Sequence, residues 1–85
     1  MNKHISYNTS GTCSRRIEID IENGIVTKVK FEGGCSGNTQ GLSALCVGMT
    51  PEEIITRLSG IKCGFKPTSC PDQLAKALKK YLETA

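Results

Sequence analysis

Cysteines are the side chains of this sequence whose type and spacing are best suited to chemistry. The chain has five of them among 85 residues, and four fall in turns or at the ends of predicted elements: Cys13, Cys35, Cys63 and Cys70. Thiolates on glycine-rich corners suit a tetrahedral zinc site or an iron–sulfur cluster, because short loops supply the ligand angles and let backbone N–H groups approach sulfur. We therefore predict that these four cysteines hold one metal centre, zinc or an iron–sulfur cluster.

Cys70 stands where a helix is predicted to begin. Pro71 suits the first helical position, because the N–H that proline lacks would be unpaired there. This makes Cys70 the predicted N-cap, with Ser69 as the alternative. A thiol there meets unpaired N–H groups and the positive end of the helix dipole, and both favour the thiolate, which binds metals and attacks electrophiles. Thiol redox chemistry, with Cys63 or Cys35 as the resolving cysteine, is therefore the rival to metal binding.

The fifth cysteine and the only histidine are expected to lie outside this site. Cys46 falls in the apolar stripe of a predicted helix, where a small core residue is the simpler interpretation. His4 lies in a predicted short edge strand, residues 4–7, and is expected in water. Since the pattern places no histidine near a cysteine, it gives acid–base catalysis little support, and we do not expect the chain to be an enzyme alone. A structural interaction domain with scattered buried cysteines is the third alternative.

A β-hairpin is the clearest element that positions these cysteines. Ile17, Ile19 and Ile21 alternate with acidic residues, a turn follows at Asn23-Gly24, and apolar residues alternate with charged ones again over residues 27–32. A two-residue turn would place lysines opposite the isoleucines. We therefore predict a three-residue loop, residues 22–24, with Gly24 left-handed.

This predicted register has a consequence for the cysteines. It pairs Ile17 with Val29 and, towards the open end of the hairpin, Cys13 with Gly33. Cys35 is then a diagonal neighbour of Cys13 on the isoleucine face, at roughly 7–8 Å between backbones. That separation suits two ligands of one metal.

Three short helices are predicted after the hairpin. The first spans residues 38–47, with an apolar stripe of Leu42, Leu45 and Cys46. The second begins at the capping sequence Thr50-Pro51-Glu52-Glu53 and stops at Gly60. The third spans residues 71–83. Since each helix and the hairpin have one face to bury, we predict an α+β fold in two layers, a small antiparallel sheet with three helices packed on one face.

Length and composition limit the remaining classes. Eighty-five residues suit a single domain, residues 1–85, whose thin core makes a homodimer an open alternative. The net charge is +3, but the lysines near the C-terminus lie on the wet face of a helix without interleaved aromatics, so nucleic acid is not the expected partner. No stretch resembles a signal peptide or a membrane span, so we expect a cytoplasmic chain. Five cysteines there indicate metal or redox chemistry rather than structural disulfides.

Residues 68–72 spell Thr-Ser-Cys-Pro-Asp, the signature for which the TSCPD domain family is named. Residues 31–38 (FEGGCSGN) and 60–64 (GIKCG) also resemble stretches shared in that family. The whole chain is similar to its short stand-alone form, whose function is uncharacterised. A similar domain is an appendage of adenosylcobalamin-dependent ribonucleotide reductases, so the resemblance implies an accessory role with that enzyme or a redox protein. The chain is too short to be the reductase itself.

Residues 11–53 also resemble, more weakly, the U-type iron–sulfur scaffold proteins. That likeness would match Cys13, Cys35 and Cys70 to the three scaffold cysteines. The chain departs from the scaffolds at Ser14-Arg15, where they carry an aspartate, and Cys63 is extra. A fourth thiolate would close the site, which suits structural zinc or a held cluster better than cluster donation.

Overall fold

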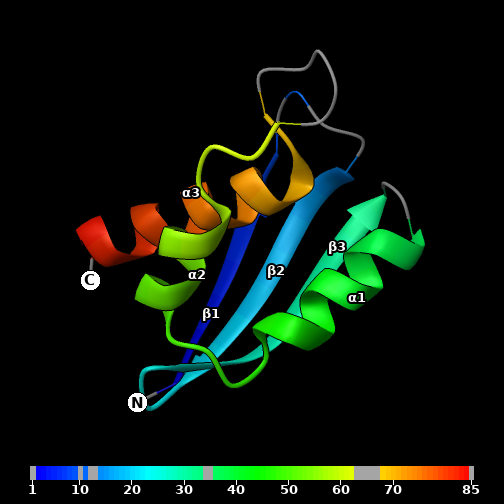
Figure 1. Ribbon diagram of the computed structural model, residues 1–85. Coiled ribbons are helices and arrows are strands. Elements are labelled where there is room, and N and C mark those ends of the chain that lie inside the picture. Colours follow the sequence, from blue (N-terminus) through cyan, green and yellow to red (C-terminus); the bar gives the residue numbers. More distant parts are fainter. Residues whose placement is uncertain (1, 10, 12–13, 34–35, 63–67, 85) are drawn as a thin grey trace.

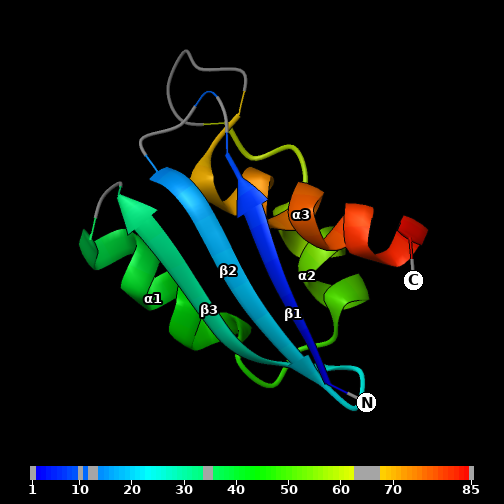
Figure 2. The ribbon, with the colours of Figure 1, turned by 180° about the vertical axis from the view of Figure 1, so that it is seen from behind.

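The computed structural model describes residues 2–9, 11, 14–33, 36–62 and 68–84 (Figure 1). Its elements follow the chain as three strands and then three helices: β1 Asn2–Asn8, β2 Ser14–Glu22, β3 Ile25–Gly33, α1 Ser36–Cys46, α2 Pro51–Leu58 and α3 Cys70–Thr84. The strands form an antiparallel sheet in the order β1-β2-β3. All three helices cover the same face of that sheet (Figures 1 and 2), so the predicted two-layer α+β fold is confirmed.

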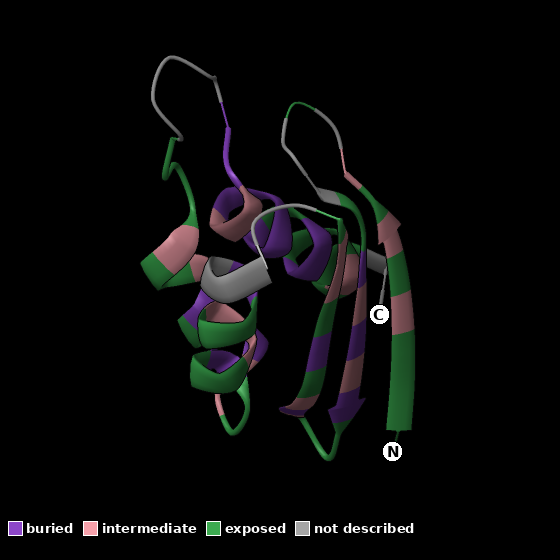
Figure 3. Ribbon diagram, turned by 90° about the vertical axis from the view of Figure 1, so that its right-hand side faces the viewer, coloured by how far each residue is buried: buried purple, intermediate pink, exposed green. Residues whose placement is uncertain are grey.

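The core lies between the sheet and the helices. Ile17, Ile19 and Ile21 of β2 are fully buried, as the alternating pattern predicts. Leu74 and Leu78 of α3 pack against them from the helix layer. Figure 3 shows buried residues alternating along the strands with intermediate and exposed ones. Burying apolar surface stabilises a fold by about 25 cal/mol per Å². Burial of this single inner face is the main force that joins the two layers.

The hairpin turn has two residues, so the prediction of a three-residue loop is wrong. Asn23 and Gly24 have φ angles of 53° and 79°, the two positive values that a type I′ turn requires. Thr27 is an extra residue in β3, because Asp20 pairs with Lys28 whereas Ile21 pairs with Val26. This β-bulge shifts the register by one residue, which turns the lysines outward in spite of the short turn.

The observed register also changes the partners along the hairpin. Ile17 lies opposite Phe31, not Val29. Arg16 lies opposite Glu32, and its Nε donates a hydrogen bond of 2.7 Å to that carboxylate. A second irregularity between Ser14 and Arg16 places Ser14 opposite Gly33. The prediction that gave Gly33 to Cys13 is therefore wrong.

The helices begin close to their predicted positions, and α2 matches best. Its N-cap Thr50 accepts a bond of 3.2 Å from the Glu53 N–H, while Glu53 Oε1 accepts one of 3.1 Å from the Thr50 N–H. Helix α1 begins two residues earlier than predicted, at Ser36. The prediction of its apolar stripe is wrong at Leu45, which is 75% exposed, whereas Cys46 of the same stripe is 2% exposed. No helix in the described part of the chain has the length and apolar character needed to cross a membrane.

Candidate metal centre

The start of α3 carries a buried polar cluster around Ser69. The Ser69 hydroxyl accepts a hydrogen bond of 3.2 Å from the Asp72 N–H and donates one of 2.6 Å to the Ile61 carbonyl. Ser69 is therefore the N-cap and Cys70 the first helical residue, so the preferred prediction of Cys70 as N-cap is wrong and its alternative is correct. A hydroxyl oxygen is a stronger acceptor than a thiol, and serine is among the preferred N-caps.

Asp72 is the buried anion of this cluster, at 5% exposure. It accepts a hydrogen bond of 2.7 Å from the Gly60 N–H and a very short one from the Thr68 hydroxyl. It also forms an ion pair of 3.4 Å with Lys76 Nζ. The Thr68 hydroxyl is the main cause that holds the pKa of this carboxyl below its ordinary value, with the Gly60 N–H and Lys76 acting in the same sense against burial. Asp72 thus joins the end of α2 to the start of α3.

Gly11, between β1 and β2, also reaches this cluster. Gly11 has a φ of +76°, and a Cβ built on it would lie 3.0 Å from Thr68 Cγ2. Thr68 is fixed in turn by Gln73, whose amide nitrogen donates to its hydroxyl at 3.0 Å. Both Thr68 and Gln73 are buried. Glycine at position 11 therefore allows the chain before β2 to approach the start of α3 closely.

Described neighbours of all four predicted ligands thus meet at one end of the molecule. Gly11 precedes Cys13 by two residues and touches Thr68, which precedes Cys70 by two. The start of β2, the end of β3 and the start of α3 lie at this same end (Figure 1). In the sheet, Ser14, which follows Cys13, pairs with Gly33, which lies two residues before Cys35. In the helix layer, the carbonyl of Ile61, two residues before Cys63, accepts a hydrogen bond from Ser69, the residue before Cys70.

The structure places one of the four predicted ligands directly. Cys70 is the first residue of α3, half-buried and not in a disulfide. Cys13, Cys35 and Cys63 lie outside the described residues. Within those residues, no group of three or more His, Cys, Asp or Glu side chains is arranged to hold a metal ion.

The two residues set aside by the sequence pattern are elsewhere, as predicted. Cys46 belongs to the hydrophobic core, and burial raises the pKa of its thiol. His4 is exposed on the outer face of the sheet, where its Nδ1 donates to Asp20 at 2.5 Å and its Nε2 lies 3.3 Å from Glu18. Neither side chain lies at the start of α3.

Sequence reasoning missed Asp72 and Thr68, which organise the polar cluster without being ligands. A signal for Asp72 was present, because Ser69 followed three residues later by an acid is the pattern of a helix start. The hydrogen bond from Gly60 to Asp72 joins residues 12 positions apart, and no local pattern predicts it.

These features define a class of protein: a small α+β domain in which a polar cluster at the last helix gathers the ends of three cysteine-bearing segments. Residues 2–82 match the family model of the TSCPD domain, so the chain belongs to the TSCPD domain family. Three of the five residues of that name, Thr68, Ser69 and Asp72, belong to the polar cluster. No curated protein and no solved structure matches the chain.

Proposed function

We propose that this protein is a small metal-binding module that holds zinc or an iron–sulfur cluster through Cys13, Cys35, Cys63 and Cys70. One observation carries the proposal: described residues within two positions of each cysteine contact one another at one end of the fold. A four-thiolate set of this kind suits a closed, structural site, which would add stability to a thin core.

The donor chemistry at the described part of this site fits the proposal. Cys70 lies at the first position of α3, next to Ser69 of the buried polar cluster. The buried carboxylate of Asp72 is already bound by its own donors and does not compete as a ligand. A bound metal would supply a cross-link between the sheet and the helix layer.

The role of such a module is proposed as an accessory one. The TSCPD resemblance links it to ribonucleotide reduction, and the weaker scaffold resemblance links it to iron–sulfur handling, with a reductase or a redox protein as partner. The cytoplasm is the proposed location, because five cysteines in one small domain suit metal or redox chemistry in a reducing compartment. The module is not proposed to catalyse a reaction alone.

Metal content of protein purified without oxygen tests the proposal. We expect about one zinc ion or one cluster per chain, with a visible absorption band in the case of a cluster. Each of the four cysteines changed to serine should lower metal content, whereas Cys46→Ala, the matched control, should not. A reconstituted chain that retains no metal, with all thiols freely titratable, contradicts the proposal.

Thiol redox exchange through Cys70 is the second candidate. The observation that favours it is the half-buried thiol of Cys70 at the first position of α3, outside any disulfide. It predicts a disulfide between Cys70 and a resolving cysteine that forms with an oxidised dithiol partner and is reversed by a reduced one. Cys70→Ser should abolish this exchange, and unchanged exchange in that variant rules the candidate out. A purely structural domain would tolerate serine at all four positions apart from a loss of stability.

A further inference from the structure

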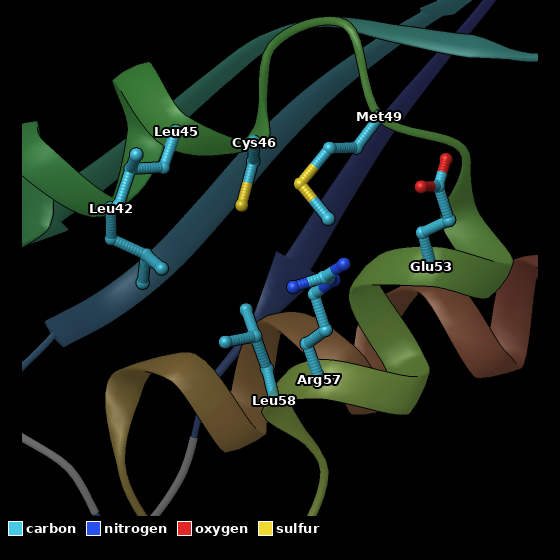
Figure 4. A pocket seen from close by; sticks show the side chains of 7 residues that line it. All are labelled: Leu42, Leu45, Cys46, Met49, Glu53, Arg57 and Leu58. Carbon is cyan, nitrogen blue, oxygen red and sulfur yellow. The ribbon is translucent and has the colours of Figure 1, made fainter.

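An apolar groove opens between α1 and α2, on the side of the helix layer away from the sheet. It has a volume of about 290 Å³ and is lined by residues of both helices and their linker: Leu42, Leu45, Cys46, Met49, Glu53, Arg57 and Leu58 (Figure 4). The groove exists because α1 packs on β3 whereas α2 packs on α3, so the two helices have different supports.

The linker between the two helices holds this groove in shape. The Val26 N–H donates to the Met49 carbonyl at 2.9 Å, and the Gly48 N–H donates to the Val26 carbonyl at 2.8 Å. Val26 lies next to the bulge of β3, an edge strand of the sheet, and its outward-facing backbone groups pair with the linker. The end of α1 and the start of α2 are therefore fixed to the sheet, and the groove between them is preformed.

Exposed apolar side chains lie beside this hollow. Leu45 is 75% exposed and Val47 is 50% exposed, the two most exposed large apolar residues in the described part of the chain. Leu45 also lines the groove. A single exposed leucine elsewhere needs no explanation, but one that lines an apolar groove is the composition of an interaction surface.

The same rim carries one charge of each sign, four residues apart on α2. Arg57 extends from α2 toward Cys46 and Met49 across the groove (Figure 4) and forms no hydrogen bond or ion pair with the residues that the structure describes. Glu53 uses Oε1 to cap Thr50, which leaves its other carboxylate oxygen facing outward. The surface thus presents a protruding side chain, Leu45, next to an apolar groove, and a cation, Arg57, next to an anion, Glu53.

We propose that a second copy of this chain covers the groove in a two-fold dimer. A surface that carries both halves of each complementary pair matches itself under a two-fold axis, as an isologous interface requires. With the axis across the groove, α2 runs antiparallel to its copy, and residue 53 of one chain faces residue 57 of the other. Arg57 then gains a second carboxylate besides that of Glu53 in its own chain, with which it already interacts electrostatically. Leu45 of each chain is covered by the other. This interface is independent of the proposed metal site.

Sedimentation velocity of the intact chain across micromolar to millimolar concentration tests the dimer. Leu45→Asp and Arg57→Glu should each raise the dimer dissociation constant by about tenfold or more, because one buries a charge and the other sets like charges face to face. Both positions are exposed, so the monomer should fold normally by circular dichroism. The matched controls Leu82→Asp and Lys79→Glu, on the surface of α3, should leave the dissociation constant unchanged.

Two results would overturn the proposal. A wild-type chain that stays monomeric at millimolar concentration assigns the groove to a different partner. A dimer that the α3 controls weaken, while Leu45→Asp and Arg57→Glu do not, uses another surface. Because metal content can be measured on the same samples, failure of the dimer and failure of the metal site are separate outcomes.

Discussion

Asp72 is the residue on which the polar cluster depends, because its carboxylate joins three parts of the chain. Gly60 at the end of α2 and Thr68 before α3 both donate to it, and Lys76 on the next turn of α3 pairs with it. These bonds replace water at a side chain that is 5% exposed. Hydrogen bonds to a charged acceptor inside a protein are stronger than neutral ones, so one carboxylate can fix several backbone positions.

Asp72→Ala should therefore destabilise the fold by about 2 kcal/mol, because it leaves the buried Thr68 hydroxyl and the Gly60 N–H without their acceptor. Urea denaturation of the metal-free protein measures this loss. Lys76→Met is the control, since it removes only the exposed ion pair and should cost under about 0.5 kcal/mol. Equal effects of the two substitutions would show that the carboxylate does not hold the cluster.

Two glycines allow the turn and helix assignments to be tested at the scale of single elements. Gly24 forms the hairpin turn with a φ of +79°, whereas Gly41 lies within α1, and a Cβ at either position meets no atom within 4 Å. Only backbone conformation therefore distinguishes them. Gly24→Ala should destabilise the protein by about 1 kcal/mol through left-handed strain, and Gly41→Ala should stabilise it by up to about 1 kcal/mol.

Thermal unfolding followed by circular dichroism at 222 nm reports both changes on the same scale. Opposite signs are the expected result. A stabilising Gly24→Ala would contradict the left-handed backbone that the type I′ turn requires at this position.

The sequence predicted the elements well where periodicity and caps are local. The isoleucines of β2, the capping box at Thr50 and the core position of Cys46 all appear as expected. The register failed because Thr27 forms a bulge, and what supports that bulge is the distant linker bonded to Val26. The prediction that Leu45 belongs to the apolar stripe failed for a similar reason, since no local pattern shows that α1 and α2 pack on different elements.

The candidate site was predictable to the same extent. Residue type and position nominated the four cysteines, and the structure shows contacts among their described neighbours. The pairing that the sequence used to bring Cys13 and Cys35 together was wrong by one residue. The two-residue turn and the bulge at Thr27 shift the register by two residues, and the irregularity after Ser14 reverses one of them. Convergence of the segments instead rests on the buried polar cluster, which depends on contacts between distant residues.

The sheet gives the whole molecule two unlike faces, which makes its stability depend on pH. The inner face is aliphatic, and the outer face carries paired charges. His4 bonds to Asp20, with Glu18 beside it, and Arg16 bonds to Glu32. The hydrogen bond to Asp20 is the main cause that raises the pKa of His4 above its ordinary value of 6.5. Arg16 is the main cause that lowers the pKa of Glu32 below its ordinary 4.5.

These shifts predict a stability maximum between the ordinary values of the two groups. Protonated His4 favours the folded state, so its contribution is complete below pH 6.5 and is lost as the pH rises through the higher folded pKa. Ionised Glu32 also favours the folded state, so its contribution is present above pH 4.5 and is lost as the pH falls through the lower folded pKa. Urea midpoints measured from acid to mildly alkaline pH should follow this shape. His4→Gln should flatten only the decline above pH 6.5, and Glu32→Gln only the decline on the acid side. If His4→Gln leaves the alkaline decline intact, another group titrates there and the outer-face pair does not stabilise the edge strand.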